Sequence, residues 1–547
     1  MAIPPPPTFT VFRNPTFRDL WIATLASNFG GLVQSVGAAW LMTSLTASES
    51  MVALVQASVT LPLMLFSLTA GVFADNFDRR KIMIWAQCLM CAASVGLAFM
   101  AFEGWLTPWL LLSLTFLIGC GTALNNPSWQ ASVGDIVSKA ELPAAVSVNS
   151  MGFNMMRSVG PAAGGAIVAT FGAAAAFAVN AASYIAVIAA LLNWHPTPKE
   201  RRLPREKFGS AFAAGLRYVA MSPNLIRTIM RGFLFGFAAI SSQALLPLIV
   251  REHLEGDSLT YGILLGAFGF GAVIAALVNN RLRARFRNET VARIGFAGFA
   301  LSCVILALTA STLIAGTALL LAGLCWVISL SLFNTMVQLS TPRWVVGRVI
   351  ALYQTGTFGG MAAGAGLWGA FAESGTLHGA LLGAAAVMLL GIAFGAFAPL
   401  PDQADLNLDP ANRFREPPLS LDIKPQSGPI MVMVDYQIDE ADVPRFLELM
   451  AIRRRIRIRD GAGHWTLLRD LENPDLWSES YHVPTWVEYI RHHERRTTTD
   501  AENIEELRKL HRGDGPMHVH RMIERHSVSV RDAIPRRSKP ENVTGES

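Results

Sequence analysis

The sequence predicts an all-α membrane protein with twelve transmembrane helices in two six-helix lobes, followed by a small cytosolic α+β domain. Three observations lead to this prediction. The chain of 547 residues is 52% hydrophobic and 16% charged, so it is more apolar and less charged than most soluble proteins. Its apolar runs are long enough to cross a bilayer, which takes about 20 residues. After Pro399 the composition becomes rich in Arg, Glu, Asp and His.

The apolar runs define the expected spans and domains. Polar residues 195–223 form the longest break between spans and divide them into two sets of six. The expected spans are 20–43, 50–74, 82–102, 109–133, 144–171, 174–194, 225–250, 260–279, 292–309, 313–339, 349–371 and 379–397. The expected domains are a first lobe at 1–194, an inter-lobe loop at 195–223, a second lobe at 224–400, a linker at 401–428 and the cytosolic domain at 429–547.

The loops between these spans alternate in charge. One set carries Lys or Arg throughout, from Arg13 and Arg18 before the first span to Arg343 and Arg348 before the eleventh. The other set lacks both residues, except for Arg251 after the seventh span. Short loops rich in Lys and Arg stay in the cytoplasm. We therefore expect a multi-pass protein of the cell (inner) membrane with both termini in the cytoplasm.

Several classes of site are not expected. All five Cys lie in apolar runs, so the sequence predicts no disulfide framework. A nucleotide-phosphate loop of the G-x-x-x-x-G-K-[ST] type is missing, so we expect no ATP hydrolysis and no cofactor, with energy supplied by a gradient. The net charge of +5 comes from loops beside the membrane and from a mixed-charge tail, which indicates membrane lipid and not nucleic acid as a partner.

A charged hinge separates the second and third spans. Its residues are spaced as Gly71-x-x-x-Asp75-x-x-x-Arg79-Arg80-Lys81 between two runs without formal charge. This spacing resembles the signature between the second and third helices of major facilitator superfamily transporters, although Asp78 stands where that family usually has Gly. The alternative is a generic basic loop.

The resemblance implies a gate at this hinge. In proteins similar to this one, the Asp and Arg of the motif hold the inward mouth closed, a role that falls here on Asp75 and Arg79. Asp135, just after the fourth span, is placed to join them. We expect the set of Gly71, Asp75, Arg79, Arg80 and Asp135 to stabilise the outward-open state.

The fifth span contains a second motif. Its Gly residues allow close helix packing, and Pro161 removes one backbone hydrogen bond so that the helix can bend. The segment resembles the Gly-Pro-x-x-Gly-Gly core found in the fifth helix of major facilitator antiporters, which export their cargo, although Met156 replaces a further Gly. Ordinary small-residue packing is the alternative. The motif residues are Arg157, Gly160, Pro161, Gly164 and Gly165.

Arg157 is an ionisable side chain inside an expected span. Such residues usually face a cavity or a partner, because a charge in lipid is costly. Arg157 would then bind an anionic group of a substrate or pair with a carboxylate. The alternative is that it lies near the cytoplasmic end of its span and extends to the interface.

Polar residues deep in the spans predict a substrate cavity. Each costs free energy in lipid unless it finds a partner, and many are expected to be structural. No Asp or Glu lies in the middle of an expected span, so proton coupling is implied by the resemblance alone. The expected cavity residues are Asn28, Gln34, Gln56, Asn126, Gln130, Asn154, Gln243, Asn334 and Gln338.

The two lobes repeat one another weakly. Asn126 to Gln130 at the end of the fourth span matches Asn334 to Gln338 at the end of the tenth. The hinge also has a fainter copy after the eighth span, with Asn279 for Asp75. Corresponding positions in both lobes predict parallel halves related by an axis along the membrane normal.

The tail after residue 428 has the element order βαββαβ. This order predicts a ferredoxin-like sandwich and resembles the small dimeric barrels of the antibiotic-biosynthesis monooxygenase type. Eight of the eleven His lie here, in spacings that fit no standard zinc site. We expect a regulatory or dimerisation module, and therefore a possible homodimer. The expected strands are 430–436, 465–469, 477–483 and 517–522, and the helices are 440–458 and 484–510.

Residues up to about 401 resemble the exporter branch of the superfamily that includes enterobactin exporters and the transmembrane secretion effector family. The resemblance rests on the hinge, the fifth-span motif, residues 13–21 and residues 125–130. It implies a secondary transporter, not an enzyme, that exports a small molecule such as a siderophore or drug using the proton gradient. The alternatives are a membrane-bound sensor or importer regulated by the tail, and a transporter fused to a monooxygenase-like enzyme.

Overall fold

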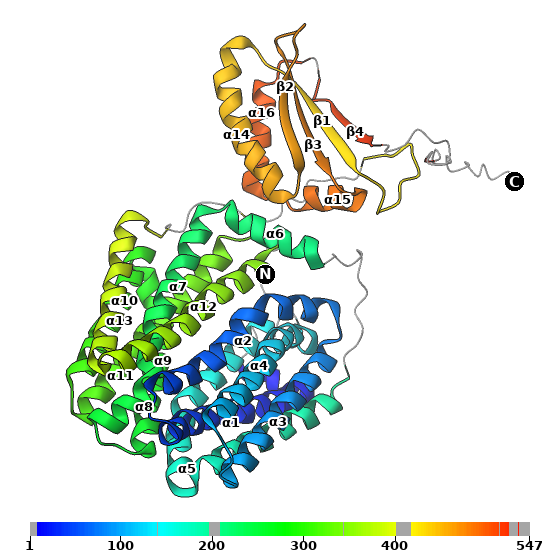
Figure 1. Ribbon diagram of the computed structural model, residues 1–547. Helices are drawn as coiled ribbons and strands as arrows, with labels where there is room; N and C mark the ends of the chain where they lie inside the picture. The colour runs from blue at the N-terminus through cyan, green and yellow to red at the C-terminus, as the bar shows by residue number, and fades with distance from the viewer. Residues whose placement is uncertain are drawn as a thin grey trace, which may run out of the picture. The chain divides into compact units, whose positions relative to one another are not determined.

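The computed structural model describes residues 8–138, 141–195, 208–342, 344–400, 408, 417–513, 515–524 and 534. They form two compact units. The first comprises Met1–Phe208, Asn224–Gln338 and Ile350–Gln403, and the second comprises Gly209–Pro223, Leu339–Val349 and Ala404–Ser547. The membrane helices make up the first unit, with an N-terminal lobe coloured blue to teal and a C-terminal lobe coloured green to yellow (Figure 1).

The N-terminal lobe holds six spans in five continuous helices. Gly172 lies inside α5 with φ 78°, a backbone conformation that Gly adopts without strain, and it divides this 52-residue helix into two spans. Asp78 caps α3, because its carboxylate accepts hydrogen bonds from the backbone N–H groups of Arg80 and Lys81. Its departure from the family pattern therefore has a local role. The helices are η1 (Thr8–Arg13), α1 (Pro15–Leu45), α2 (Glu49–Asn76), α3 (Arg79–Phe102), α4 (Pro108–Ile136) and α5 (Leu142–Asn193).

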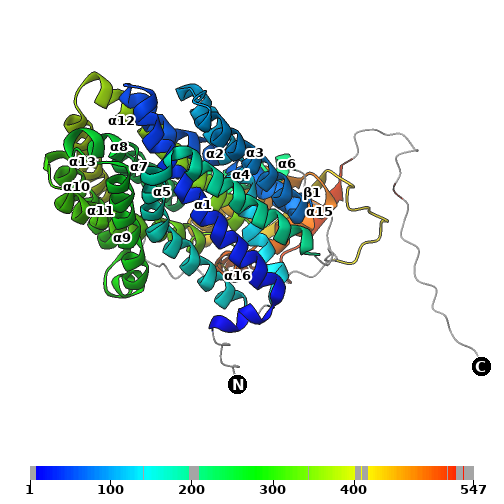
Figure 2. The ribbon, with the colours of Figure 1, turned by 90° about the horizontal axis from the view of Figure 1, so that it is seen from below.

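The C-terminal lobe holds the other six spans. The first of them runs through three consecutive helical segments from Pro223 to His253. The elements are α7 (Pro223–Ala244), α8 (Leu246–Leu248), η2 (Ile249–His253), α9 (Ser258–Arg285), α10 (Asn288–Leu308), α11 (Thr312–Leu339), α12 (Val346–Ser374) and α13 (Leu377–Phe397). Figure 2 shows the two lobes side by side from a second direction.

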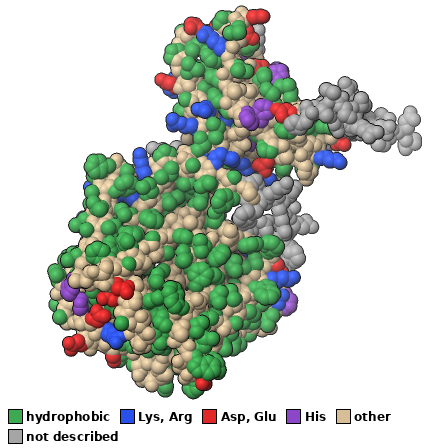
Figure 3. Space-filling view, viewed as in Figure 1, with side chains coloured by type: hydrophobic (Ala, Val, Ile, Leu, Met, Phe, Trp, Pro, Cys, Tyr) green, Lys and Arg blue, Asp and Glu red, His purple; other side chains and the backbone are tan. Residues whose placement is uncertain are grey.

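The predicted membrane architecture is confirmed. Within the described ranges, nine helices are long and apolar enough to cross a bilayer, and α5 among them supplies two spans. Together with α1 and α12, which are also long enough to cross a bilayer, they account for the twelve expected spans. Large apolar side chains such as Trp85 and Leu277 are three-quarters exposed. Hydrophobic groups cover most of the visible face of this unit, as expected for contact with lipid (Figure 3).

The C-terminal domain is a four-stranded antiparallel sheet with the strand order β2-β3-β1-β4. β1 pairs with β3 and β4, which places Tyr436 opposite Trp477 and Val432 opposite Arg521. The predicted βαββαβ order is confirmed, and this strand order is that of a ferredoxin-like fold. The elements are β1 (Ile430–Gln437), η3 (Glu440–Asp442), α14 (Val443–Asp460), β2 (Gly463–Arg469), β3 (Leu476–Val483), α15 (Trp486–Glu494), α16 (Thr498–Leu510) and β4 (Val519–Ile523).

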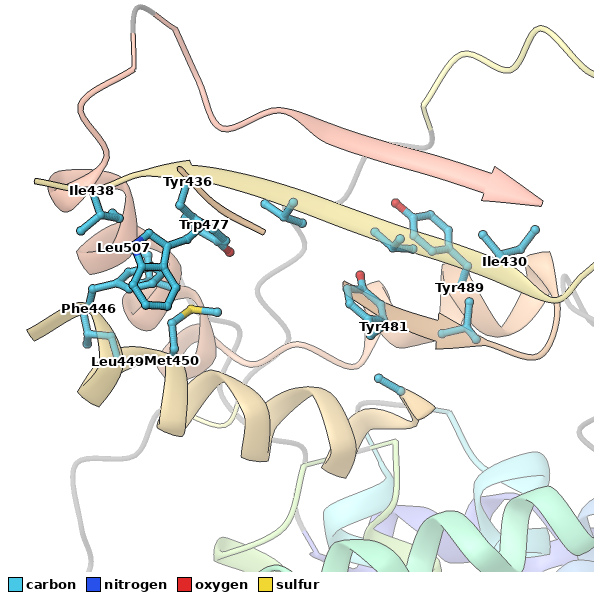
Figure 4. Close-up of a cluster of buried hydrophobic side chains, with 14 of the residues drawn as sticks. Ile430, Tyr436, Ile438, Phe446, Leu449, Met450, Trp477, Tyr481, Tyr489 and Leu507 are labelled. Atoms are coloured by element: carbon cyan, nitrogen blue, oxygen red, sulfur yellow. The ribbon is translucent and has the colours of Figure 1, made fainter. Parts of the chain in front are cut away.

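One helix expected in this domain is divided. The predicted helix at 484–510 is α15 and α16, because Thr497 starts a new helix. Its hydroxyl accepts from the N–H of Asp500, while the Asp500 carboxylate accepts from the N–H of Thr497. The core of the domain lies between the sheet and its helices and includes Tyr436, Phe446 and Trp477 (Figure 4).

Two further segments belong to the same compact unit as this domain. One is α6 (Phe208–Ala220), an amphipathic helix within the stretch expected as an inter-lobe loop, and the other is the connection between α11 and α12. The guanidinium carbon of Arg459 lies 5.5 Å from the ring centroid of Tyr218 on α6. That of Arg495 lies 4.6 Å from the ring centroid of Trp344 in the connection. Cation–π contacts therefore hold both segments on the domain.

Candidate functional site

A cavity of about 360 Å³ lies within the N-terminal lobe, between α1, α3, α4 and α5. Its walls combine side-chain amides with apolar and aromatic groups, the mixture found in sites for small polar ligands. None of the described residues that line it is Asp, Glu, Lys or Arg. The lining amides are Asn28, Gln87, Asn125, Asn126, Gln130, Asn149 and Asn154.

The cavity occupies the half of the lobe next to the hinge between α2 and α3. Leu20 and Asn28 lie in the first half of α1, and Met83 lies near the start of α3. Gln130 is near the end of α4, and Asn149 is near the start of α5. If the expected topology holds, this half of the lobe faces the cytoplasm.

Four of the nine residues expected in a cavity line this one: Asn28, Asn126, Gln130 and Asn154. The other five lie outside it. Gln34 is buried, and its side-chain oxygen accepts hydrogen bonds from Ser94 and Asn180, each at 2.7 Å. This arrangement satisfies buried polar groups from three spans and is structural.

The remaining four expected cavity residues have other surroundings. Gln338 donates to the side-chain oxygen of Asn334 one turn earlier on α11, at 3.1 Å. Gln56 on α2 and Gln243 on α7 are half-buried. The two repeated segments therefore have different roles. Asn126–Gln130 contributes to the cavity wall in one lobe, whereas Asn334–Gln338 makes a contact within its own helix in the other.

The gate residues form an ion pair at the hinge. Arg79 Nη1 lies 2.6 Å from Asp135 Oδ2 and also donates to the backbone oxygen of Ala131 at 3.2 Å. Both side chains are about one-quarter exposed. The Asp75 side chain is outside the described part of the structure. Gly71 is half-buried on α2, with open space where a Cβ would be.

Arg80 has a different environment from Arg79. Its Nε donates to the backbone oxygen of Leu191, and its Nη2 donates to that of Leu192, each at 2.8 Å. These carbonyls belong to the last turn of α5, where backbone acceptors lack partners within the helix. Arg80 therefore caps the end of α5.

The second lobe repeats the hinge contact. Arg283 at the end of α9 donates to Thr335 Oγ1 on α11 at 3.0 Å, and this contact spans 52 positions. The contact of Arg79 with Ala131 also spans 52 positions. The weak sequence repeat of the hinge thus has a structural counterpart, in which Thr335 stands at the position of Ala131 in the first lobe.

The fifth-span motif lies where α5 packs against α1 and α9. A Cβ on Gly165 would come within 2.6 Å of the backbone oxygen of Ser258 and 3.0 Å of Gly262 Cα. A Cβ on Gly164 would lie 2.9 Å from Val33 Cα. Only Gly permits these approaches, so the motif joins the two lobes through α9.

Arg157 lies at the same junction of the lobes. Its guanidinium carbon is 5.2 Å from the ring centroid of Phe268 and 5.8 Å from that of Trp326, both in the C-terminal lobe. In the part of the chain that the structure describes, no ion pair or hydrogen bond of this side chain is found. The aromatic faces offset part of the cost of holding the cation there, by up to about 2 kcal/mol.

Comparison with known proteins identifies the family. Residues 7–528 match the family described as transmembrane secretion effector, and this range includes the C-terminal domain. The chain belongs to the transmembrane secretion effector family. It is therefore a secondary transporter of the major facilitator superfamily, with efflux proteins among its relatives.

Two relatives show the degree of sequence similarity. The uncharacterized MFS-type transporter YkuC of Bacillus subtilis (strain 168) is 26% identical over 295 residues, which cover 50% of this chain and 67% of YkuC. The enterobactin exporter EntS of Escherichia coli O1:K1 is 25% identical over 306 residues, which cover 55% of this chain and 72% of EntS.

Solved structures confirm the fold. A bacterial homologue of the human lysosomal transporter Spinster, in an inward-facing and occupied conformation, aligns with a TM-score of 0.57 at 13% identity, over 71% of this chain and 97% of that one. An auto-inhibited peptide transporter of the POT family aligns with a TM-score of 0.58 at 13% identity, over 74% and 98%.

In this transmembrane secretion effector protein, one ion pair within the C-terminal lobe was missed by the sequence analysis. Arg231 on α7 is 1% exposed, and its Nη1 lies 3.0 Å from Glu289 Oε2 at the start of α10. Glu289 also pairs with Arg293 and accepts from the N–H of Leu400. The sequence signal for this pair was an Arg within one expected span and a carboxylate at the start of a later helix.

Contacts also join the lobes at the end far from the hinge. The Glu373 carboxylate at the end of α12 accepts from the Ser48 hydroxyl at 3.1 Å and the Ser50 N–H at 3.3 Å. Arg251, the one cation in this set of loops, donates to the backbone oxygen of Thr43. These loop residues carried no motif, so sequence patterns did not indicate the contact.

Metal binding has no support in the described ranges, where no group of three or more His, Cys, Asp and Glu side chains is arranged to hold an ion. Cys303 and Cys325 are buried, and each of the five Cys is a free thiol.

Proposed function

We propose that this transporter exports a small, polar, neutral or anionic molecule from the cytoplasm by alternating access, driven by the proton gradient. The observation that carries the proposal is the amide-lined cavity in the hinge half of the N-terminal lobe. Amides offer both donors and acceptors, and its volume falls within the range of small-molecule sites, about 300–1,000 Å³. Without a carboxylate in the lining, the cavity disfavours a cation.

Arg157 adds a preference for negative charge. Its guanidinium lies against two aromatic rings of the opposite lobe, so an anionic group could pair with it while the lobes are together. This arrangement supports an anionic siderophore-like cargo over the cationic drugs that many efflux proteins carry. The enterobactin exporters among the relatives agree with this direction.

Two sets of contacts at opposite ends support alternating access. The pair of Arg79 and Asp135 lies at the hinge end, and Glu373 bridges the lobes to Ser48 at the far end. In our proposal the hinge contacts stabilise the outward-open state, and the Glu373 contacts stabilise the inward-open one. Both sets are formed in this structure, and opening on the far side requires the Glu373 contacts between the lobes to break.

The environment of the protein is part of the same proposal. We place it in the inner membrane with both termini in the cytoplasm, because Lys and Arg gather in one set of loops. Proton coupling rests on the family resemblance. A homodimer formed through the C-terminal domain is the proposed assembly.

Flux in inverted membrane vesicles tests the function. With an imposed pH gradient, a labelled catecholate siderophore should accumulate, and an uncoupler should abolish the accumulation. Gln130→Ala in the cavity wall should lower the flux about ten-fold, the effect of losing roughly 1.4 kcal/mol of cargo binding. Its repeat counterpart Gln338→Ala, outside the cavity, is the matched control and should leave flux unchanged.

The opposite results would redirect the proposal. Accumulation of a cationic dye but not of the siderophore would contradict the inferred cargo charge. Saturable binding without flux of either compound would favour a membrane-bound sensor. Flux that persists without a pH gradient would remove the proton from the mechanism.

A further inference from the structure

Two side chains in the wall of the membrane cavity have buried polar atoms without partners. Gln87 on α3 is 3% exposed and Trp129 on α4 is 8% exposed, and both line the cavity. Among the described residues, neither the Gln87 Oε1 atom nor the Trp129 indole N–H has a hydrogen-bond partner. A buried donor or acceptor without a partner costs free energy, so a ligand that supplied one would be bound favourably.

The acceptor on Gln87 follows from its contact with a neighbouring amide. Gln87 Nε2 donates to Asn125 Oδ1 on α4 at 3.2 Å, and Asn125 lines the same cavity. Oε1 is therefore the atom of the Gln87 amide that has no partner in the described part of the chain. An amide oxygen can only accept hydrogen bonds. A cargo group that binds Gln87 must then present a donor.

The donor on Trp129 lies one helical turn from Asn125. These residues are four positions apart on α4, so they share one face of the helix and lie about 6 Å apart along its axis. Trp129 also belongs to a buried apolar cluster that includes Phe17, Met83 and Val148. Such side chains cannot accept a hydrogen bond from the indole. An acceptor for Trp129 can instead come from the cavity that it lines.

We propose that Gln87 and Trp129 bind an uncharged end of the cargo that presents a hydrogen-bond donor and an acceptor on neighbouring atoms. An amide, or a pair of hydroxyl groups on adjacent carbons, has this chemistry. A carboxylate offers acceptors alone and would leave Gln87 unpaired, whereas an ammonium offers donors alone and would leave Trp129 unpaired. The inference rests on the proposed export function, because it assigns the specificity of the same cavity.

Apolar side chains also line this cavity, namely Leu20, Met83, Val187 and Leu191. The cargo group is therefore expected to be carried on an apolar frame such as a ring. A site built to hydrogen-bond a donor rejects an analogue that lacks this donor, because the acceptor of the site is then left unpaired. Gln87 was not among the residues that the sequence analysis singled out.

Matched uncharged probes test the proposal on the full-length protein in detergent micelles. Benzamide has an amide donor and acceptor on an apolar ring, whereas N,N-dimethylbenzamide keeps the acceptor and lacks the donor. The readout is the proton NMR signal of the Trp129 indole N–H, which is assigned by its loss in Trp129→Phe. Both probes should move this signal downfield in a saturable way, but benzamide should bind about ten-fold more tightly, a difference of about 1.4 kcal/mol.

Two variants assign this discrimination to Gln87. Gln87→Met keeps the length of the side chain and removes the acceptor, so the affinities of the two probes should then agree within about two-fold. A residue that only supported the packing of α3 would change both affinities by the same factor. Gln243→Met is the matched control and should preserve the ten-fold ratio. Gln243 also has a buried amide nitrogen without a partner among the described residues, but it lies on α7, outside the cavity.

A second indole provides a control for the signal itself. The Trp477 indole N–H in the C-terminal domain is also buried without a partner in the described ranges. It does not line the cavity, so its signal, assigned with Trp477→Phe, should not move with either probe.

Several outcomes would overturn the proposal. They are equal affinities of the two probes in the parent protein, an unchanged ratio in Gln87→Met, a stronger response to benzoate or benzylammonium than to benzamide, and no shift of the Trp129 signal at about 10 mM benzamide, roughly the weak limit of a specific site. Siderophore flux together with any of these results would retain the export function. Benzamide binding at Trp129 without siderophore flux would contradict export and retain this assignment.

Discussion

The N-terminal lobe and the C-terminal domain handle buried polar groups in different ways. In the lobe, Gln34, Ser94 and Asn180 satisfy one another as neutral groups, and the cavity is lined with further amides. In the domain, Glu479 is buried between the two guanidinium groups of Arg453 and Arg457. A lobe surrounded by lipid gains little from ionised groups, whereas a domain folded in water can pair them densely. The comparison teaches that buried polar groups are balanced by neutral hydrogen bonds in the lobe and by ion pairs in the domain.

Removing the buried carboxylate should have the largest effect. Glu479→Gln leaves Arg453 and Arg457 buried without a counter-charge, and we expect it to destabilise the domain by about 3–5 kcal/mol. Hydrogen exchange of β1 and β3 in the full-length protein measures the loss. Glu505→Gln, in an exposed pair on α16, is the matched control and should cost less than about 0.5 kcal/mol. A similar effect of both substitutions would show that the cluster does not govern the stability of the domain.

Acid should destabilise the domain but not the neutral network of the lobe. Burial lowers the pKa of His492 and His493 in the folded domain, while the unfolded chain takes up protons below about pH 6.5. Their contribution is fully present above that pH and is lost as the pH falls, at about 1.4 kcal/mol per pH unit for each ring. Hydrogen exchange of β1 between pH 7 and 5, corrected for the intrinsic rate, measures the slope.

Two substitutions should change this pH dependence in opposite directions, and a third is a control. His492→Gln should make it shallower, and the exposed His518→Gln should not change it. Asp460 acts in the opposite direction, because burial raises its pKa to about 6 and the folded domain takes up that proton before the unfolded chain does. Asp460→Asn should therefore steepen the loss below pH 6. An unchanged slope in both His492→Gln and Asp460→Asn would contradict these assignments.

Disrupting the amide network of the lobe should have an intermediate effect on stability. Gln34→Leu leaves the Ser94 hydroxyl and the Asn180 amide without their acceptor, at a cost of about 1–3 kcal/mol. Thermal unfolding in detergent measures it, and the shift should be the same at pH 7 and pH 5. Ser44→Ala, exposed near the end of α1, is the control. A pH-dependent shift would place an ionised group in this network.

The gate pair, about one-quarter exposed, should contribute least to stability. Arg79→Gln is expected to lower the free energy of unfolding by only about 0–1 kcal/mol, because both partners are in contact with water. It should nevertheless reduce vesicle flux several-fold if the pair stabilises one state of the cycle. Arg283→Gln makes the same change at the repeat position, where the partner is the neutral Thr335. Equal flux losses would indicate that charge pairing at Asp135 is not the relevant feature.

Features that depend on a local sequence pattern could be predicted from the sequence alone. Spans follow from unbroken apolar runs, and the βαββαβ order follows from alternating and helical patterns in the tail. The hinge contact between Arg79 and Asp135 was also within reach, because the family motif named Arg79 and Asp135 follows the fourth span at the same side of the lobe. The family itself could be inferred from four short motifs.

Tertiary structure alone decided which polar residues meet. Asn28, Asn126 and Asn154 come from three helices and share a cavity, whereas Gln34, only six positions from Asn28, belongs to a sealed network. The ion pair of Arg231 with Glu289 spans 58 positions. The sequence records that a side chain is polar, but its partner depends on which helix faces pack together.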